Sequence, residues 1–254
     1  MASVWIVAGL AFGAAFGAVA VAADAVAPAA PAGEAVAADD AAGAEGAAQP
    51  VADGIPSGGE VAPDAADEAA AVTAPSGAVA VTEAFNGELI ELLRASDSLD
   101  HAGRVDRLSP ALSGNFDLDF MAAKVLGRRW KALSPEEQAR WREGFTQLMT
   151  ANYAGRFVGW ADQSFTTLDE QEAGHGTVLV RTRLHVPGEE EDVALDYRLR
   201  EVDGSWRIID VFLNGTVSEL ALRRSEYSSV LKRDGFEALI ASVQRKRDEL
   251  AAAP

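Results

Sequence analysis

The sequence of 254 residues contains no cysteine, and no lysine or arginine precedes Arg94. Without cysteine the chain has no disulfide framework, no thiolate metal site and no cysteine nucleophile. The net charge of −17 is unevenly spread, because residues 1–93 carry 13 of the 39 acidic groups and none of the 22 basic ones, which leaves residues 94–254 at −4. Neither part shows the clustered basic side chains that neutralise nucleic-acid phosphates, so we expect no nucleic-acid partner.

Catalytic and metal-binding motifs are also scarce. The three histidines are expected to be solvated: His101 in a polar connection, His175 beside a glycine turn and His185 on the wet face of a strand. No G-x-S-x-G turn, H-E-x-x-H helix or phosphate-binding loop occurs. The acidic run 189–192 lacks the spaced ligands of a calcium loop, and Arg223 and Arg224 indicate an exposed helix face rather than an anion site. We therefore expect no metal, no cofactor and no enzymatic activity.

The first 80 residues lack the composition of a folded domain. An uncharged run from Ala2 to Ala23 is long enough to span a membrane, but its alanines and glycines and its A-x-A sites favour a cleaved signal peptide over residues 1–25. No positive n-region precedes the run, so an uncleaved N-terminal anchor is the alternative. Residues 26–80 are rich in Ala, Pro and acidic residues and hold no aromatic side chain, which predicts a disordered acidic linker. The folded domain is expected over residues 81–254.

Both ends of that domain show helical periodicity. Apolar residues recur at helical spacing over residues 81–95 and 116–130. A further helix is predicted to begin at Pro135 after an N-cap at Ser134, with Glu137 placed for a capping box, and to run to Phe157. Two more helices are predicted over residues 217–235 and 235–250, with a glycine at their junction.

Between these helices the period changes to two. Residues 177–186 and 192–200 alternate apolar and polar side chains, residues 206–213 form a more apolar strand, and residues 164–170 form a weaker one. Short turn sequences join them, as in an antiparallel meander. The predicted fold class is α+β: a mainly antiparallel, curved sheet of about four strands packed against flanking helices.

Asp210 interrupts the apolar strand in WRIIDVFLNG. A buried carboxylate requires hydrogen bonds or a charged partner, so we favour a structural role that fixes the sheet to the following turn. The alternative is a general base in an apolar pocket, as in an enzyme of ketosteroid-isomerase shape, with Tyr153 or Tyr197 as its partner across the pocket.

Three blocks of the domain resemble the MlaC family of periplasmic phospholipid-binding proteins, also called the toluene tolerance family, and within it the hopanoid-associated HpnM branch. They are FDLDFMAAKVLGRRWKALSPEEQARWREGFTQLMTANYA, YRLREVDGSWRIIDVFLNG and VSELALRRSEYSSVLKRDGFEALIASV. The resemblance implies a fold like that of the nuclear-transport-factor-like group and a periplasmic carrier, expected to be a monomer, for phospholipid or hopanoid. It also implies two partners, an inner-membrane ABC transporter with MCE domains and an outer-membrane lipoprotein. The long acidic linker departs from the family pattern and leaves the mode of membrane attachment open, so a membrane-anchored scaffold or adaptor is another alternative.

A lipid with two chains buries about thirty methylenes, on the order of 25 kcal/mol of transfer free energy, which requires an enclosed cavity. We expect the bulky residues on the helical face and on the inward strand faces to line it. They are Trp130, Phe145, Leu148, Met149, Tyr153, Phe157, Val180, Leu195, Tyr197 and Phe212. If a cavity lies there, Leu148→Trp or Val180→Trp should displace lipid while most of the stability is kept.

Overall fold

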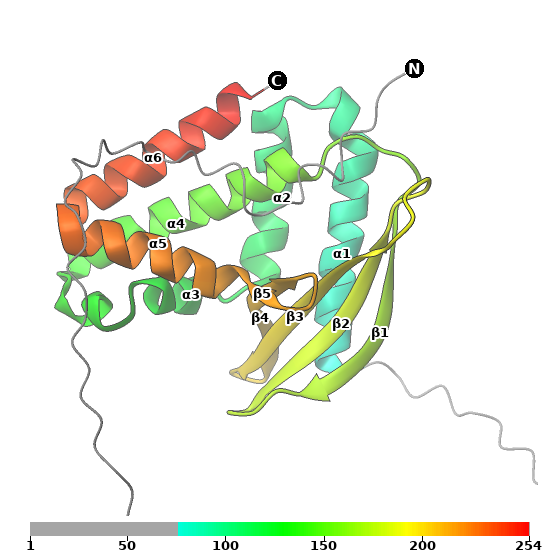
Figure 1. Cartoon of the computed structure of the whole chain (residues 1–254), viewed down its shortest axis with the longest axis horizontal. Helices are drawn as coiled ribbons and strands as arrows, with labels where there is room; N and C mark the ends of the chain where they lie inside the picture. Colours follow the sequence, from blue (N-terminus) through cyan, green and yellow to red (C-terminus); the bar gives the residue numbers. More distant parts are fainter. Residues whose placement is uncertain (1–75, 254) are drawn as a thin grey trace, which may run out of the picture. The chain divides into compact units, whose positions relative to one another are not determined.

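The computed structural model describes residues 76–253 (Figure 1). The expected signal peptide or anchor, and the linker up to Pro75, lie outside the described residues. The helices are α1 Gly77–Ala95, η1 Ser96–Ser98, α2 His101–Asn115, α3 Leu118–Leu126, η2 Gly127–Ala132, α4 Pro135–Arg156, α5 Glu219–Asp234 and α6 Phe236–Ala252. The strands are β1 Ser164–Glu172, β2 Thr177–His185, β3 Val193–Val202, β4 Ser205–Leu213 and β5 Val217–Ser218.

The five strands form one antiparallel sheet in the order β1-β2-β3-β4-β5. In Figure 1, α1 runs along the sheet, while α4, α5 and α6 lie together beside it. The predicted class is confirmed: an α+β fold with a mainly antiparallel sheet and flanking helices. The sheet has one strand more than expected, because the two-residue β5 pairs with the end of β4 after the turn at Asn214 and Gly215.

The helix α2 was missed by the sequence prediction, and His101 is not solvated. Its side chain is 9% exposed, and its Nε2 lies 3.1 Å from the carbonyl oxygen of Ala151 in α4. Asp100 caps the helix by accepting a hydrogen bond from Gly103, while Leu108 and Leu112 are buried. The segment contains a proline and many polar residues, so two buried leucines, eight and twelve residues after the cap, give too weak a period to be recognised.

The alternation predicted for β2 and β3 is correct on the inward face and wrong at one outward position. Tyr197 and Leu199 are fully buried, as expected. Asp196, expected on the wet face, is only 4% exposed, and its carboxylate accepts a hydrogen bond from the backbone of Thr182 at 3.2 Å. The turn after β4 approaches it closely, since a Cβ on Gly215 would lie 3.4 Å from its Oδ2. The outer face of β3 is therefore partly covered by the turn that follows β4 and leads to α5.

The helix α1 begins at Gly77, four residues before the predicted boundary, because Ser76 caps it. The Ser76 hydroxyl accepts a hydrogen bond from Val79 N–H at 3.2 Å. A chain of residues 76–254 should therefore be more stable than one of residues 78–254 by about 1 kcal/mol, the usual value of such a cap. Thermal unfolding of the two chains tests this, and equal melting temperatures would show that the cap contributes nothing.

Candidate functional site

The apolar interior lies between the sheet and the helices and is rich in aromatic rings. Phe85 on α1 is at its centre: its ring meets those of Phe116, Tyr153 and Tyr197 edge-on, at centroid distances of 4.8, 5.7 and 6.0 Å. Edge-to-face packing of this kind is favourable beyond the area that the rings bury. The same core contains eight of the ten side chains that we expected at a lipid site: Phe145, Leu148, Met149, Tyr153, Phe157, Val180, Leu195 and Tyr197.

The structure places the other two predicted residues elsewhere. Phe212 pairs with Asp196 across β3 and β4, so it lies on the sheet face opposite that of Tyr197 and Val211. Trp130 is half-buried in η2, where it borders a hollow of about 440 Å³ with Phe120 and several basic residues from α3, η2 and α5. The guanidinium of Arg142 lies 5.1 Å from the centroid of the Trp130 ring. Trp130 packs against the apolar core only from its edge, and Phe212 is not part of that core.

The interior is closely packed in this structure. Leu148 is 1% exposed and Val180 is 0% exposed. Side chains so little exposed touch no space that a water molecule could enter, so a tryptophan at either position would overpack the core by about 1–3 kcal/mol or more. In this closely packed state both substitutions are therefore expected to lower the stability, and a position beside open space is better suited to a filling experiment.

Open space of that kind lies between α1 and β1, at the edge of the helix–sheet interior. A groove of about 590 Å³ is lined by Glu83, Ala84, Asn86, Gly87, Glu88, Ile90, Glu91, Arg94, Gln163, Ser164 and Phe165. Ile90 and Phe165 are half-buried and pack against the apolar core. A Cβ built on Gly87 would meet nothing within 4 Å. No sequence pattern marks α1 and β1 as the two sides of a groove.

Asn86 connects this groove with the interior. It lines the groove, is 3% exposed, and its Oδ1 accepts a hydrogen bond from the hydroxyl of Tyr197 at 2.7 Å. Burial raises the pKa of Tyr197 well above its ordinary value, so the hydroxyl stays protonated and donates. The amide nitrogen of Asn86 has no acceptor among the described residues. The groove therefore ends at a polar group set within an aromatic core.

Asp210 has the structural role that we favoured. Its Oδ1 accepts hydrogen bonds from Val211 N–H at 2.9 Å and Leu220 N–H at 3.0 Å, and its Oδ2 accepts one from the Ser218 hydroxyl at 2.6 Å. It thereby joins β4 to the first turn of α5, where a carboxylate is also favoured by the helix dipole. Burial raises its pKa from the ordinary value. Tyr197 donates to Asn86 instead, which removes one of the two tyrosines considered as its catalytic partner.

Arg223 and Arg224 differ, contrary to the expectation that both lie on an exposed helix face. Arg223 is 2% exposed and donates to Glu219 at 2.6 Å and to the Tyr227 hydroxyl at 3.1 Å, whereas Arg224 is exposed. The buried pair lies one helical turn apart in α5, and Tyr227 stacks edge-on against Trp141 of α4. The cluster fixes α5 to α4, and its charges are used within the fold.

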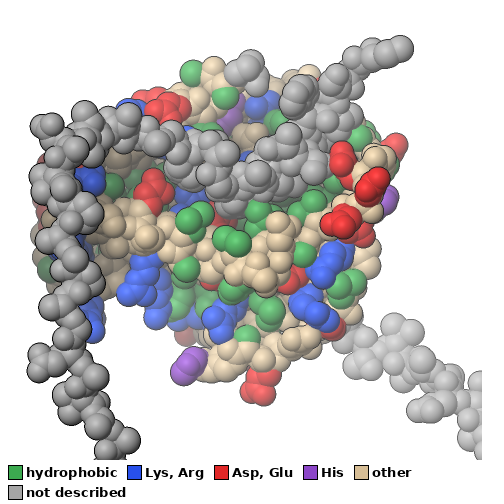
Figure 2. All heavy atoms as spheres, viewed as in Figure 1, with side chains coloured by type: hydrophobic (Ala, Val, Ile, Leu, Met, Phe, Trp, Pro, Cys, Tyr) green, Lys and Arg blue, Asp and Glu red, His purple; other side chains and the backbone are tan. Residues whose placement is uncertain are grey.

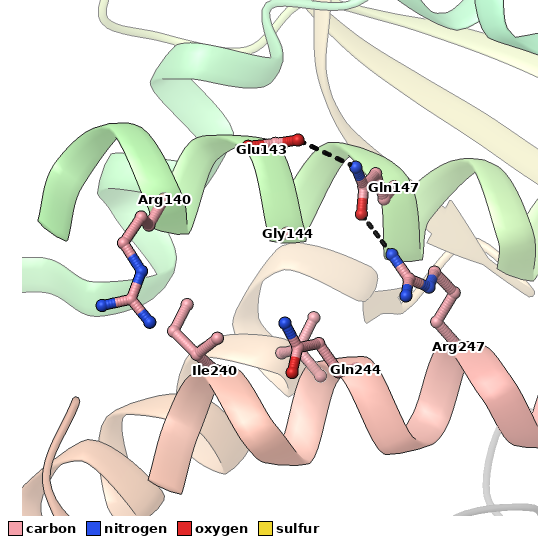
Figure 3. A pocket seen from close by; sticks show the side chains of 8 residues that line it. Arg140, Glu143, Gly144, Gln147, Ile240, Gln244 and Arg247 are labelled. Carbon is pink, nitrogen blue, oxygen red and sulfur yellow. Dashed lines mark hydrogen bonds between the residues drawn. The ribbon is translucent and has the colours of Figure 1, made fainter. Parts of the chain in front are cut away.

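The cleft between α4 and α6 and the tip of the β2–β3 hairpin are both polar and exposed to solvent. The cleft between α4 and α6 measures about 270 Å³ and is crossed by a hydrogen bond from Arg247 to Gln147 (Figure 3). Arg140 donates two hydrogen bonds to the carboxylate of Glu237 near the other end of the cleft.

Acidic side chains gather at the tip of the β2–β3 hairpin (Figure 2), as expected for residues 189–192. His175 and His185 are exposed, also as expected.

Among residues 76–253, no cluster of three or more His, Asp or Glu side chains could hold a metal ion. Within the same range, no helix combines the length and the apolar character that crossing a membrane requires.

The fold and the site define an α+β binding protein, in which a surface groove meets an aromatic interior between one helix and a curved sheet. The model of the MlaC protein family matches residues 83–245, and the chain belongs to the MlaC family. It is 23% identical over 136 residues to the intermembrane phospholipid transport system binding protein MlaC of Haemophilus influenzae, covering 52% of this chain and 63% of that relative. The match therefore leaves more than a third of the relative's length uncovered.

A solved structure is also similar: the phospholipid-binding protein from Ralstonia solanacearum in complex with a phospholipid. The TM-score is 0.60 at 22% sequence identity, and the match covers 68% of this chain and 98% of that one. At this identity the likeness supports the fold, which is the MlaC phospholipid-binding fold. These similarities identify the MlaC family but do not distinguish its HpnM branch from other members.

Proposed function

We propose that this protein is a non-enzymatic phospholipid carrier that takes up acyl chains through the α1–β1 groove. The observation that carries the proposal is the position of Asn86, which lines the groove and accepts a hydrogen bond from Tyr197 of the aromatic interior. The names of its relatives, a phospholipid transport protein and a phospholipid-binding protein, support the same cargo. Because the interior is closely packed, chains that enter from the groove must displace side chains along α1 and the sheet, and the eight buried residues named above would then line them.

The energetics of lipid burial also favour a protein that exchanges lipid with membranes over one that retains it. Burying the two chains gains on the order of 25 kcal/mol relative to water, but a bilayer offers nearly the same environment, so the preference between protein and membrane is small. Direction must then come from partners. We propose that these are an inner-membrane ABC transporter with MCE domains and an outer-membrane lipoprotein, and that the protein works as a monomer in the periplasm, exported or held by an N-terminal anchor.

Lipid extraction from vesicles tests this proposal. The delipidated full chain is mixed with phosphatidylethanolamine and phosphatidylglycerol vesicles, separated from them, and its lipid is quantified; a parallel set of vesicles contains a hopanoid. We expect about one phospholipid per chain. Hopanoid uptake in its place would make the chain a hopanoid carrier. If neither lipid leaves the vesicles, the carrier proposal is wrong and the adaptor alternative gains support.

A further inference from the structure

Asn86 is a buried amide with two N–H groups that it does not use within the described fold. Its Oδ1 is occupied by the Tyr197 hydroxyl, while its Nδ2 has no acceptor there and less than 1 Å² of exposed surface. An unpaired buried donor lowers stability, so most buried polar groups are paired. Tyr197 donates its only proton to Oδ1, so it leaves Nδ2 as the free side of the amide.

The position of Asn86 relates this donor to the lipid path. The residue lines the groove, and its neighbour Phe85 lies at the centre of the aromatic core. A lipid whose chains pass from the groove into the core therefore passes the amide at the level where its chains join the headgroup region. That level of a phospholipid holds the acyl ester carbonyls.

The charges at the groove favour a neutral acceptor over a phosphate. Glu83, Glu88 and Glu91 line the rim, with Arg94 as the one cation among the lining residues, and Arg94 is already paired with Glu91 at 2.5 Å. A phosphate buried beside Asn86 would lie in an apolar surrounding with no free cation among the lining residues and with three exposed carboxylates at the rim. An ester carbonyl carries no charge and accepts a hydrogen bond in such a surrounding.

We propose that Asn86 donates a hydrogen bond from Nδ2 to an acyl ester carbonyl of the bound lipid, and so selects ester-linked lipids over lipids without that carbonyl. The Tyr197 hydroxyl holds the amide in the required orientation. This inference rests on the proposed carrier function and names the group of the cargo that the groove recognises. It predicts discrimination at the glycerol linkage, independent of the headgroup.

Competition between ester-linked and ether-linked lipids isolates this contact. Vesicles that contain equal amounts of dipalmitoyl and dihexadecyl phosphatidylcholine, which differ in the ester carbonyls, are mixed with the delipidated full chain, and the bound lipids are quantified by mass spectrometry. We expect the wild type to prefer the ester lipid about fivefold, the usual value of one net hydrogen bond. Asn86→Leu should take up both lipids equally.

A double variant controls for a loss of stability caused by the single substitution. Asn86→Leu leaves the Tyr197 hydroxyl without its acceptor, whereas the double variant Asn86→Leu/Tyr197→Phe removes both partners and should melt close to the wild type. The double variant should also show no preference. Equal uptake of both lipids by the wild type, or a preference that survives in the double variant, would overturn the inference while leaving the carrier function intact. A wild type that binds neither lipid would overturn both.

Discussion

Gly87→Trp is expected to lower the phospholipid content of the protein by about tenfold or more without lowering its stability. Gly87 lies in the middle of α1 and lines the groove, and a side chain there has open space around its Cβ. An indole can therefore occupy the groove, where it blocks the path to Asn86. The helix itself gains a few tenths of a kcal/mol, because tryptophan, although only a moderate helix former, is still better than glycine. Lipid extraction from the purified variant, together with thermal unfolding, measures both effects.

Gly87→Ala is the matched control. Alanine also removes glycine's helix penalty, about 0.5–1 kcal/mol, but its methyl group leaves the groove open. This variant should therefore carry as much lipid as the wild type and melt slightly higher. If the tryptophan and alanine variants carry equal amounts of lipid, the groove between α1 and β1 is not the entrance.

Asp210→Ala is expected to destabilise the fold by about 3 kcal/mol, because it leaves buried donors on β4 and α5 without their acceptor. For a domain of this size the melting temperature should fall by about 6–12 °C. The lipid content of the protein that remains folded should be unchanged, since the carboxylate joins β4 to α5 and takes no part in the groove. Denaturant unfolding and lipid quantification check the two statements.

Asp210→Asn refines this test through pH. Burial raises the pKa of Asp210 in the folded state, so the folded protein binds a proton that the unfolded chain releases. The wild type should therefore lose stability as the pH rises from the ordinary aspartate range, about pH 4, through the raised pKa. The stability advantage of the wild type over Asp210→Asn should be largest at acid pH and shrink towards pH 7. A difference that grows with pH would mean that its hydrogen bonds outweigh burial.

The sequence predicted elements wherever local chemistry and the tertiary fold agree. Ser134 and Glu137 form the complete capping box, so the start of α4 was correct to the residue. The two-residue period of β2 and β3 identified Val180 and Tyr197 as inward-facing, because strands with one buried face show that alternation directly.

The remaining features depend on contacts between segments far apart in the chain. The burial of Asp196 follows from the path of the chain after β4, and that of His101 from the packing of α2 on α4. Phe212 was expected on the inward face but lies on the other one; no alternation marks its side, because β4 is apolar on both faces and a bulge shifts its register against β3 between Arg198 and Leu199. The Asn86–Tyr197 pair joins residues 111 positions apart and has no local signal.

Native mass spectrometry of the full chain, purified gently and without added lipid, tests the carrier function most directly. Lipid that has been enclosed during expression remains with the protein, so the spectrum reports both its mass and its stoichiometry. We predict a species heavier than the unliganded chain by the mass of one phospholipid, which is lost in Gly87→Trp and retained in Gly87→Ala. A spectrum that shows only the unliganded chain, in wild type and variants alike, would contradict the function proposed for this fold.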